Sequence, residues 1–138
     1  MIKSETTIRV RYGETDQMGY VYHGVYAQYY EVGRVEALRQ MGFSYREIEE
    51  RGILMPVVEL SVSFKKPARY DDEITVTTIM YGKPTGVRLL FDYECRNAAG
   101  ELLNTGKVTL VCQEKSTGKM CRIPDWFLTA FDQYNRNY

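Results

Sequence analysis

The stretch that decides the fold, residues 15–30, reads TDQMGYVYHGVYAQYY. It holds an aspartate, the only histidine of the chain, two glycines and five tyrosines. Before it, residues 6–12 alternate with a period of two, which predicts a half-buried strand with Tyr12 among its inward-facing side chains. After it, apolar residues recur at steps of three and four, which predicts a helix. Asp16 therefore stands where a strand gives way to a helix, and a charge at that place requires an explanation.

The predicted helix ends at Gly42, a residue type that commonly follows the last helical turn. Gly33 lies inside it, where glycine costs about 1 kcal/mol relative to alanine, so we expect the helix to approach its neighbour closely there. A second, short helix begins at Ser44, which forms a capping box with Glu47, and ends at Gly52. The inward-facing stripe of the first helix is predicted to consist of Val25, Tyr29, Val32, Val35 and Leu38.

From residue 54 onward the period is two again, which predicts a series of antiparallel strands. These strands are expected at residues 58–64, 74–80, 87–95 and 104–113. A short helix capped by Asp125 is expected over residues 125–131. A long helix placed before hairpin-linked strands packs across one face of their sheet. The sequence thus predicts a single α+β domain over residues 1–138, a curved antiparallel sheet of about five strands around one long central helix.

The composition excludes several classes of protein. Lysine plus arginine balance aspartate plus glutamate at 18 each, so no overall field attracts nucleic acid or anionic lipid. No apolar run reaches the roughly 20 residues of a membrane span, and residues 1–10 lack the apolar core of a signal peptide. The 3 cysteines are odd in number and have no CxxC spacing, which favours reduced thiols in a cytoplasmic protein over a disulfide framework or a zinc site.

Two stretches resemble a known family. YGETDQMGYVYHGVYAQYYEVGRVEALRQMG, residues 12–42, resembles the hot-dog-fold acyl-CoA thioesterases of the hydroxybenzoyl-CoA thioesterase type. In that family an aspartate is followed by a glycine, a few apolar or aromatic residues, and a histidine or tyrosine at the start of the central helix. KKPARYDDEI, residues 65–74, resembles the strand-end segment of the family. The residues that match the first pattern are Asp16, Gly19, Tyr22, His23, Tyr26 and Glu31.

The resemblance implies a hot-dog fold and the hydrolysis of acyl thioesters of coenzyme A, without a metal ion or a bound cofactor. It also implies a homodimer whose two sheets join edge to edge, or a homotetramer built as a dimer of dimers. The active sites would then lie at the dimer interface. Gly19, Tyr26 and Glu31 would line each site.

The residues themselves fit this reaction. Hydrolysis of a thioester needs a group that attacks the carbonyl or activates water, and donors for the charge that develops on its oxygen. The first turn of a helix offers free N–H groups, expected here from Tyr22, His23 and Gly24. Asp16 is then the general base or the nucleophile. His23 is the second candidate catalytic residue, and we expect it to position substrate or water rather than transfer a proton.

Several alternatives stay open. Asp16 can instead be an ordinary turn residue in a protein that binds acyl thioesters without hydrolysing them. The thiol carrier can be acyl carrier protein instead of coenzyme A, which would require a basic docking face. Basic residues near two turns are candidate ligands of the coenzyme's phosphates, although lysines also commonly protect strand edges. These candidates are Lys65, Lys66, Arg69, Lys83 and Arg88.

Overall fold

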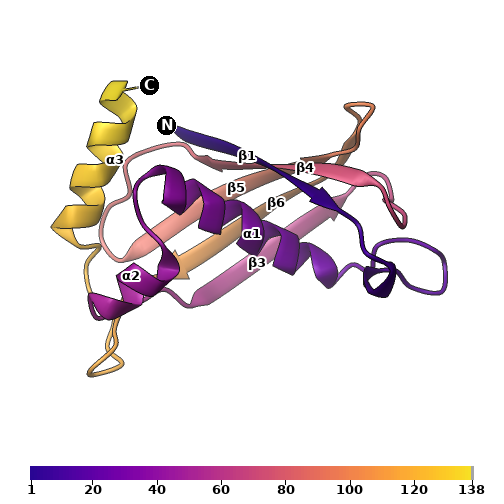
Figure 1. The fold of residues 1–138 in the computed structure, drawn as a ribbon. Coiled ribbons are helices and arrows are strands. Elements are labelled where there is room, and N and C mark those ends of the chain that lie inside the picture. Colours follow the sequence, from indigo (N-terminus) through magenta and orange to yellow (C-terminus); the bar gives the residue numbers. More distant parts are fainter. Residues whose placement is uncertain (138) are drawn as a thin grey trace.

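The computed structural model describes residues 1–137, which form one five-stranded antiparallel sheet with a long helix across one face (Figure 1). The order of the strands in the sheet is β1-β4-β5-β6-β3, so β1 and β3 are its two edges. The helix, α1, runs from Val25 to Gln40. The predicted α+β fold is confirmed. The strands are β1 (Ile2–Arg9), β3 (Val57–Phe64), β4 (Glu73–Met80), β5 (Arg88–Arg96) and β6 (Leu102–Val111).

The remaining elements close the ends of the sheet. A 3-10 turn, η1 (Tyr12–Glu14), follows β1, and a short helix, α2 (Tyr45–Glu50), follows α1. Two short strands, β2 (Ile53–Leu54) and β7 (Gln113–Glu114), pair with each other. The last helix, α3 (Asp125–Asn137), lies at the end of the sheet where the chain starts (Figure 1). None of the helices in residues 1–137 combines the length and the apolarity that crossing a bilayer demands.

The buried face of α1 differs from the predicted stripe. Val32, which was expected to point inward, is 41% exposed, whereas Tyr30 is fully buried. Tyr30 can be buried because its hydroxyl donates a hydrogen bond to Asn104 Oδ1 at 2.6 Å and its ring stacks on Tyr93 at 4.2 Å. The residues that α1 buries are Tyr26, Tyr29, Tyr30, Gly33, Arg34, Ala37 and Leu38.

Two glycines allow α1 to lie close to the sheet. A Cβ atom on Gly33 would stand only 2.4 Å from Thr78 Oγ1 of β4. A Cβ atom on Gly106 of β6 would stand 2.3 Å from Cε2 of Tyr30. Side chains at these positions would therefore push helix and sheet apart. The close approach predicted from Gly33 is confirmed.

Some predicted boundaries are wrong. β1 ends at Arg9, so Tyr12 lies in η1 and is 78% exposed instead of facing inward. The last helix continues to Asn137, six residues beyond the expected end, and Asp125 lies in its first turn. The ends of α1 and α2 are as predicted, because Gly42 and Gly52 adopt φ values of 100° and 86°, which favour glycine.

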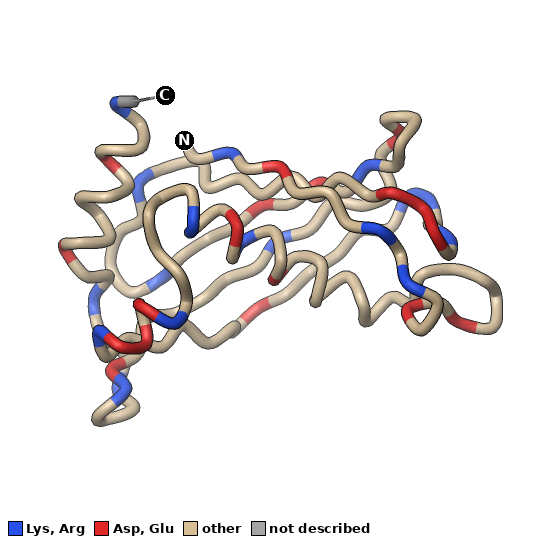
Figure 2. The backbone as a smooth tube through the Cα atoms, viewed as in Figure 1, with Lys and Arg blue, Asp and Glu red and all other residues tan. Residues whose placement is uncertain are grey.

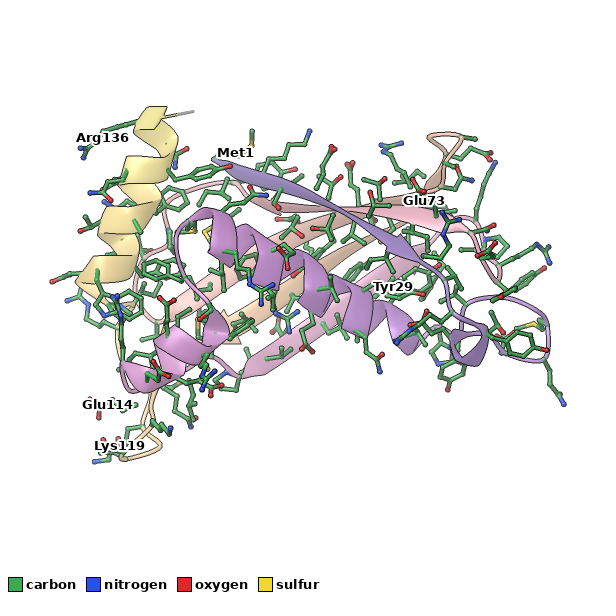
Figure 3. The ribbon with its side chains drawn as sticks, in the orientation of Figure 1. Met1, Tyr29, Glu73, Glu114, Lys119 and Arg136 are labelled. Carbon is green, nitrogen blue, oxygen red and sulfur yellow. The ribbon has the colours of Figure 1, made fainter. Side chains whose placement is uncertain are left out.

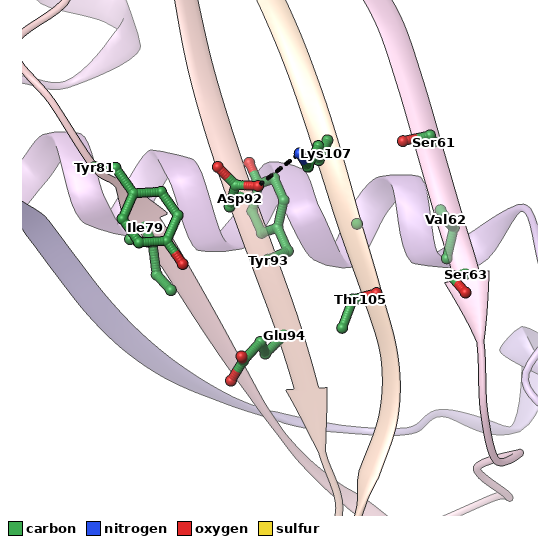
Figure 4. Close-up of a pocket in the computed structure, with 11 residues that line it drawn as sticks. Ser61, Val62, Ser63, Ile79, Tyr81, Asp92, Tyr93, Glu94, Thr105 and Lys107 are labelled. Atoms are coloured by element: carbon green, nitrogen blue, oxygen red, sulfur yellow. Dashed lines mark ion pairs between the residues drawn. The ribbon is translucent and has the colours of Figure 1, made fainter.

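The face of the sheet away from α1 is open. Figure 4 shows this face with α1 behind the strands, and polar side chains of β3, β5 and β6 line a hollow of about 370 Å³ there. Its charged pair is Asp92 with Lys107, at 3.9 Å. None of the predicted site residues lines this hollow.

The edge strand β3 also presents apolar side chains to solvent. Val57, Leu60 and Phe64 are 45%, 47% and 52% exposed. Their partners in β6 lie on the α1 side of the sheet, but α1 does not cover this edge. A single copy of the chain therefore leaves an apolar, unpaired strand edge, an arrangement that favours pairing with another strand.

Candidate active site

Two loops at one end of the sheet are joined by main-chain hydrogen bonds. One is the site loop, residues 10–24, between β1 and α1, and the other is the β3–β4 loop, residues 65–72. Both lie at the end of the sheet opposite α3 (Figure 1). The bonds that join them are Val10 N to Asp72 O at 2.9 Å, Asp71 N to Val10 O at 3.0 Å and Val21 N to Ala68 O at 2.8 Å. The strand-end segment that resembled the family is thus the support of the site loop.

Between these loops and the start of α1 lies a cleft of about 280 Å³, which we call the Asp16 cleft. It brings together five of the twelve candidates that the sequence predicted, Asp16, His23, Tyr26, Lys65 and Lys66. Apolar and basic residues from the end of β3 form its other wall. Its lining residues are Asp16, Met18, Tyr20, Val21, His23, Tyr26, Phe64, Lys65, Lys66 and Pro67.

The carboxylate of Asp16 is held by one oxygen only. Its Oδ1 accepts hydrogen bonds from the main-chain N–H groups of Met18 at 2.9 Å and Tyr20 at 3.2 Å. The φ of 79° at Gly19, which favours glycine, lets the chain turn tightly enough for both bonds. Oδ2 has no hydrogen-bond partner among residues 1–137. One oxygen thus fixes the side chain and the other is available for chemistry.

The start of α1 supplies two free donors instead of the three expected. The N–H of Tyr22 donates to the carbonyl of Glu14 at 2.9 Å, so the prediction of a free donor at Tyr22 is wrong. The N–H groups of His23 and Gly24 have no hydrogen-bond partner within the described chain. Gly24 is the cap residue of α1 and provides no side-chain cap. The ring of Tyr22 lies against that of His23, with centroids 4.2 Å apart.

The other predicted lining residues have different positions. Tyr26 is buried and meets Phe64 edge to face at 5.7 Å, and both line the Asp16 cleft. Burial raises the pKa of Tyr26, so its phenol stays protonated at neutral pH. Glu31 is exposed on α1 and does not line the cleft of a single chain.

The five candidate phosphate ligands separate into two groups. Lys65 and Lys66 line the Asp16 cleft, and the guanidinium of Arg69 lies 4.9 Å from the ring centre of Tyr20 at its side. Lys66 forms an ion pair with Glu101, whereas Lys65 Nζ donates to Ser63 Oγ at 3.1 Å and to no other described residue.

The second group, Lys83 and Arg88, borders a different hollow after the other end of β4. Lys83 is tied there to Asp132 of α3, with 2.6 Å between Nζ and Oδ2. The two groups are separated because the length of β4 lies between the turns that carry them. One chain does not bring all five cations to a single site.

A residue that the sequence did not single out, Glu14, lies at the base of the site loop and is only 9% exposed. Its Oε1 accepts hydrogen bonds from the main-chain N–H of Arg11 at 2.7 Å and from the hydroxyl of Tyr29 at 2.9 Å. Burial alone would raise the pKa of Glu14, but the hydrogen bonds from Arg11 and Tyr29 outweigh it and hold the pKa below its ordinary value. In the sequence the one signal is an acidic residue two positions before Asp16, and that signal does not indicate burial.

Comparison with known proteins shows the family of the chain. The family model described as the thioesterase-like superfamily matches residues 10–131. The chain is 37% identical to the putative acyl-CoA thioesterase YneP of Bacillus subtilis, over 94% of this chain and 96% of that protein. It is 32% identical to the acyl-CoA thioester hydrolase YbgC of Escherichia coli, over 91% and 93% of the two chains.

A solved structure is similar over the whole fold. The DHNA-CoA thioesterase of Staphylococcus aureus superposes with a TM-score of 0.89 at 38% identity, covering 99% of this chain and 93% of that one. The resemblance found in residues 12–42 is therefore confirmed at the level of the family. With a matching family model over most of its length, and relatives that align almost from end to end, the chain belongs to the thioesterase-like superfamily.

Proposed function

We propose that this protein hydrolyses acyl-CoA thioesters to a free acid and coenzyme A. The observation that carries the proposal is the composition of the Asp16 cleft. Its lining includes Asp16, with one oxygen free among residues 1–137, and His23 at the start of α1. The N–H groups of His23 and of the adjacent Gly24 have no partner within the same residues. The relatives named as acyl-CoA thioesterases align over nearly the whole chain, which supports the same reaction here.

In the proposed reaction the thioester oxygen accepts hydrogen bonds from the N–H groups of His23 and Gly24. These donors stabilise the negative charge as the carbonyl carbon becomes tetrahedral. Asp16 Oδ2 takes a proton from water, and the hydroxide adds to the carbonyl carbon. The intermediate then collapses, the C–S bond breaks and the thiolate of coenzyme A leaves with its electron pair. Because a thiol is a much stronger acid than an alcohol, no strong general acid is needed.

A second course uses the same groups. Asp16 Oδ2 attacks the carbonyl carbon directly, the thiolate leaves, and water then hydrolyses the resulting mixed anhydride. Oxygen from labelled water that appears in the carboxylate of Asp16 after a single turnover would show direct attack, with water opening the anhydride at the carboxyl carbon of Asp16. General-base catalysis places labelled oxygen only in the product acid, as does opening of the anhydride at its acyl carbon.

We also propose that the working form is a dimer, or a dimer of dimers. Phe64 stands at the end of the exposed edge strand β3 and lines the Asp16 cleft. A second copy paired along β3 would cover this strand and close the open side of the cleft. The alternative of a monomer leaves Val57, Leu60 and Phe64 in solvent.

The charge distribution favours coenzyme A over acyl carrier protein as the thiol carrier. Docking of an acidic carrier protein requires an extended basic face. Figure 2 shows basic and acidic residues interspersed along the backbone instead of separated. The cations at the Asp16 cleft, Lys65 and Lys66, form a local group suited to a phosphate.

Thiol release tests this proposal directly. The protein is mixed with a panel of aromatic and aliphatic acyl-CoA esters and with the matching acyl carrier protein thioesters, and free thiol is followed with a thiol-reactive dye. We expect release from at least one acyl-CoA ester and less from its carrier-protein counterpart. Binding of the esters without release would instead support a non-catalytic acyl-thioester-binding protein.

A further inference from the structure

We propose that Glu14 is a positioning residue that sets the distance between Asp16 and the two donors at the start of α1. This inference rests on the proposed thioesterase function but concerns a residue outside the reacting groups. Glu14 does not line the Asp16 cleft. It acts through the site loop, which carries Asp16 at its turn and His23 at its end.

The side chain of Glu14 ties the loop to the helix. Tyr29 projects from α1 and donates its hydroxyl hydrogen to Oε1 at 2.9 Å (Figure 3). The guanidinium of Arg11 donates to Oε2, with Nη2 at 3.1 Å. The carboxylate of Glu14 in η1 therefore links Arg11, the cap residue of η1, to Tyr29 of α1.

The main chain of Glu14 ties the two ends of the loop to each other. Its carbonyl accepts the N–H of Tyr22 at 2.9 Å, immediately before the free donors of His23 and Gly24. Two residues after Glu14, the N–H of Asp16 donates to the carbonyl of Tyr20 at 2.8 Å. The loop is thus a narrow hairpin with Asp16 near its turn and Glu14 at its base. A shift of Glu14 relative to α1 would move Asp16 relative to the donors.

The carboxylate charge suits this task. Four donors surround the two oxygens of Glu14, namely Arg11 N, Nε and Nη2 and the Tyr29 hydroxyl, and each oxygen can accept two bonds. A glutamine at position 14 would place an NH2 group against one of these donors. Such a variant keeps the size of the side chain but loses at least one link of the loop.

Adjacent tyrosines of α1 provide a matched test. Tyr29→Phe removes only the hydroxyl that reaches Glu14, whereas Tyr30→Phe removes a hydroxyl that reaches Asn104 in the sheet. Both side chains are buried and both lose one hydrogen bond. A merely structural role predicts similar behaviour for the two variants. A positioning role predicts that only Tyr29→Phe and Glu14→Gln change catalysis per folded molecule.

We expect kcat for thiol release to fall about tenfold in Tyr29→Phe and about tenfold to 100-fold in Glu14→Gln, because a displacement near 1 Å can cost about 100-fold. KM should stay within about twofold of the wild type, since neither group binds substrate. The double variant should be no slower than Glu14→Gln, because both changes break the same link. Tyr30→Phe should retain the kcat of the wild type.

Hydrogen exchange of the loop amides gives a second reading that does not depend on activity. Exchange at Tyr20 and Tyr22 should rise in Tyr29→Phe and stay unchanged in Tyr30→Phe. The role of Glu14 would be overturned, while the thioesterase function stands, by either of two results. One is that the folded single variants Tyr29→Phe and Glu14→Gln both keep the wild-type kcat. The other is that Tyr29→Phe and Tyr30→Phe lose kcat equally. A wild-type protein that releases no thiol from any ester would overturn the function itself, and with it the positioning role.

Discussion

Asp16 and Tyr20 face each other across the turn of the site loop and exchange hydrogen bonds in both directions. The N–H of Asp16 donates to the carbonyl of Tyr20 at 2.8 Å, and the N–H of Tyr20 donates to Asp16 Oδ1 at 3.2 Å. This pair fixes the orientation of the carboxylate without using Oδ2. It also means that the structural and the chemical parts of the Asp16 side chain can be separated by substitution.

Asp16→Asn makes that separation. Asparagine keeps the oxygen that Met18 and Tyr20 bind but replaces the free oxygen by an uncharged NH2 group. We expect thiol release to fall by at least about 100-fold while the acyl-CoA ester still binds and the stability changes little. Steady-state kinetics, calorimetric binding and thermal unfolding measure the three quantities. Near-normal turnover in a well-folded variant would remove Asp16 from the reaction and favour the binding-protein alternative.

The acid dependence of stability should report Glu14. Its pKa in the folded protein lies below the ordinary value of 4.5, so the carboxylate contributes stability at pH values above 4.5. That contribution is lost as the pH falls through the pKa of the folded state. The difference in unfolding free energy between the wild type and Glu14→Gln should therefore be largest at neutral pH and shrink below pH 4.5.

Urea unfolding of both proteins between pH 7 and about pH 3 provides this comparison. At each pH, a linear fit of the unfolding free energy against urea concentration gives its value in water. The other carboxyl groups titrate in both proteins, so most of their effect cancels in the difference. A difference in unfolding free energy between the wild type and Glu14→Gln that does not vary with pH would contradict a charged role for Glu14.

Lys65 should contribute to binding of the coenzyme. It lines the Asp16 cleft, and among residues 1–137 its Nζ donates to Ser63 Oγ alone and has no acidic partner. We expect Lys65→Ala to raise KM for acyl-CoA about tenfold with little change in kcat, because a hydrogen bond to a charged group contributes about 1.5–3 kcal/mol. Lys107→Ala is the matched control, an exposed lysine of the open sheet face. Unchanged KM in Lys65→Ala would remove this residue from the phosphate site.

The sequence predicted α1 well because the helix depends on local patterns, whereas the role of Asp16 stays a prediction. The change of period before residue 25 locates the helix, and Gly42 marks its end. The buried face of α1 was harder to predict, since Tyr30 looks more polar than Val32 yet is buried while Val32 is exposed. Its burial depends on Asn104, 74 residues away, which accepts the hydroxyl hydrogen.

Glu14 and Tyr22 show the same limit at the site. An acidic residue near the end of a predicted strand reads as solvated, and nothing local indicates that Tyr29 turns it inward. Likewise, the first N–H groups of a helix are free in general, but the N–H of Tyr22 is taken by the carbonyl of Glu14. Both features follow from the return path of the site loop, which only the folded chain defines.

The edge strand β3 should hold two copies together. Leu60 lies in the middle of this strand, is 47% exposed and points to the α1 side of the sheet, opposite Val108. A charge placed on the inward side of an edge strand blocks pairing with another strand, and the exposed position lets a single chain accept it. We expect Leu60→Lys to convert the dimer or tetramer into folded monomers, and to slow thiol release because the Asp16 cleft loses its second wall.

The variant Leu90→Lys separates the loss of pairing through β3 from the effect of an added charge alone. Leu90 is 58% exposed as well, but it lies on the inner strand β5, so the edge of β3 stays intact. Light scattering at micromolar concentration should give at least a dimer mass for the wild type and for Leu90→Lys, and a monomer mass for Leu60→Lys. A wild-type monomer would refute pairing through β3, and so would a Leu60→Lys protein that keeps the wild-type mass, because the charge would then lie outside the interface.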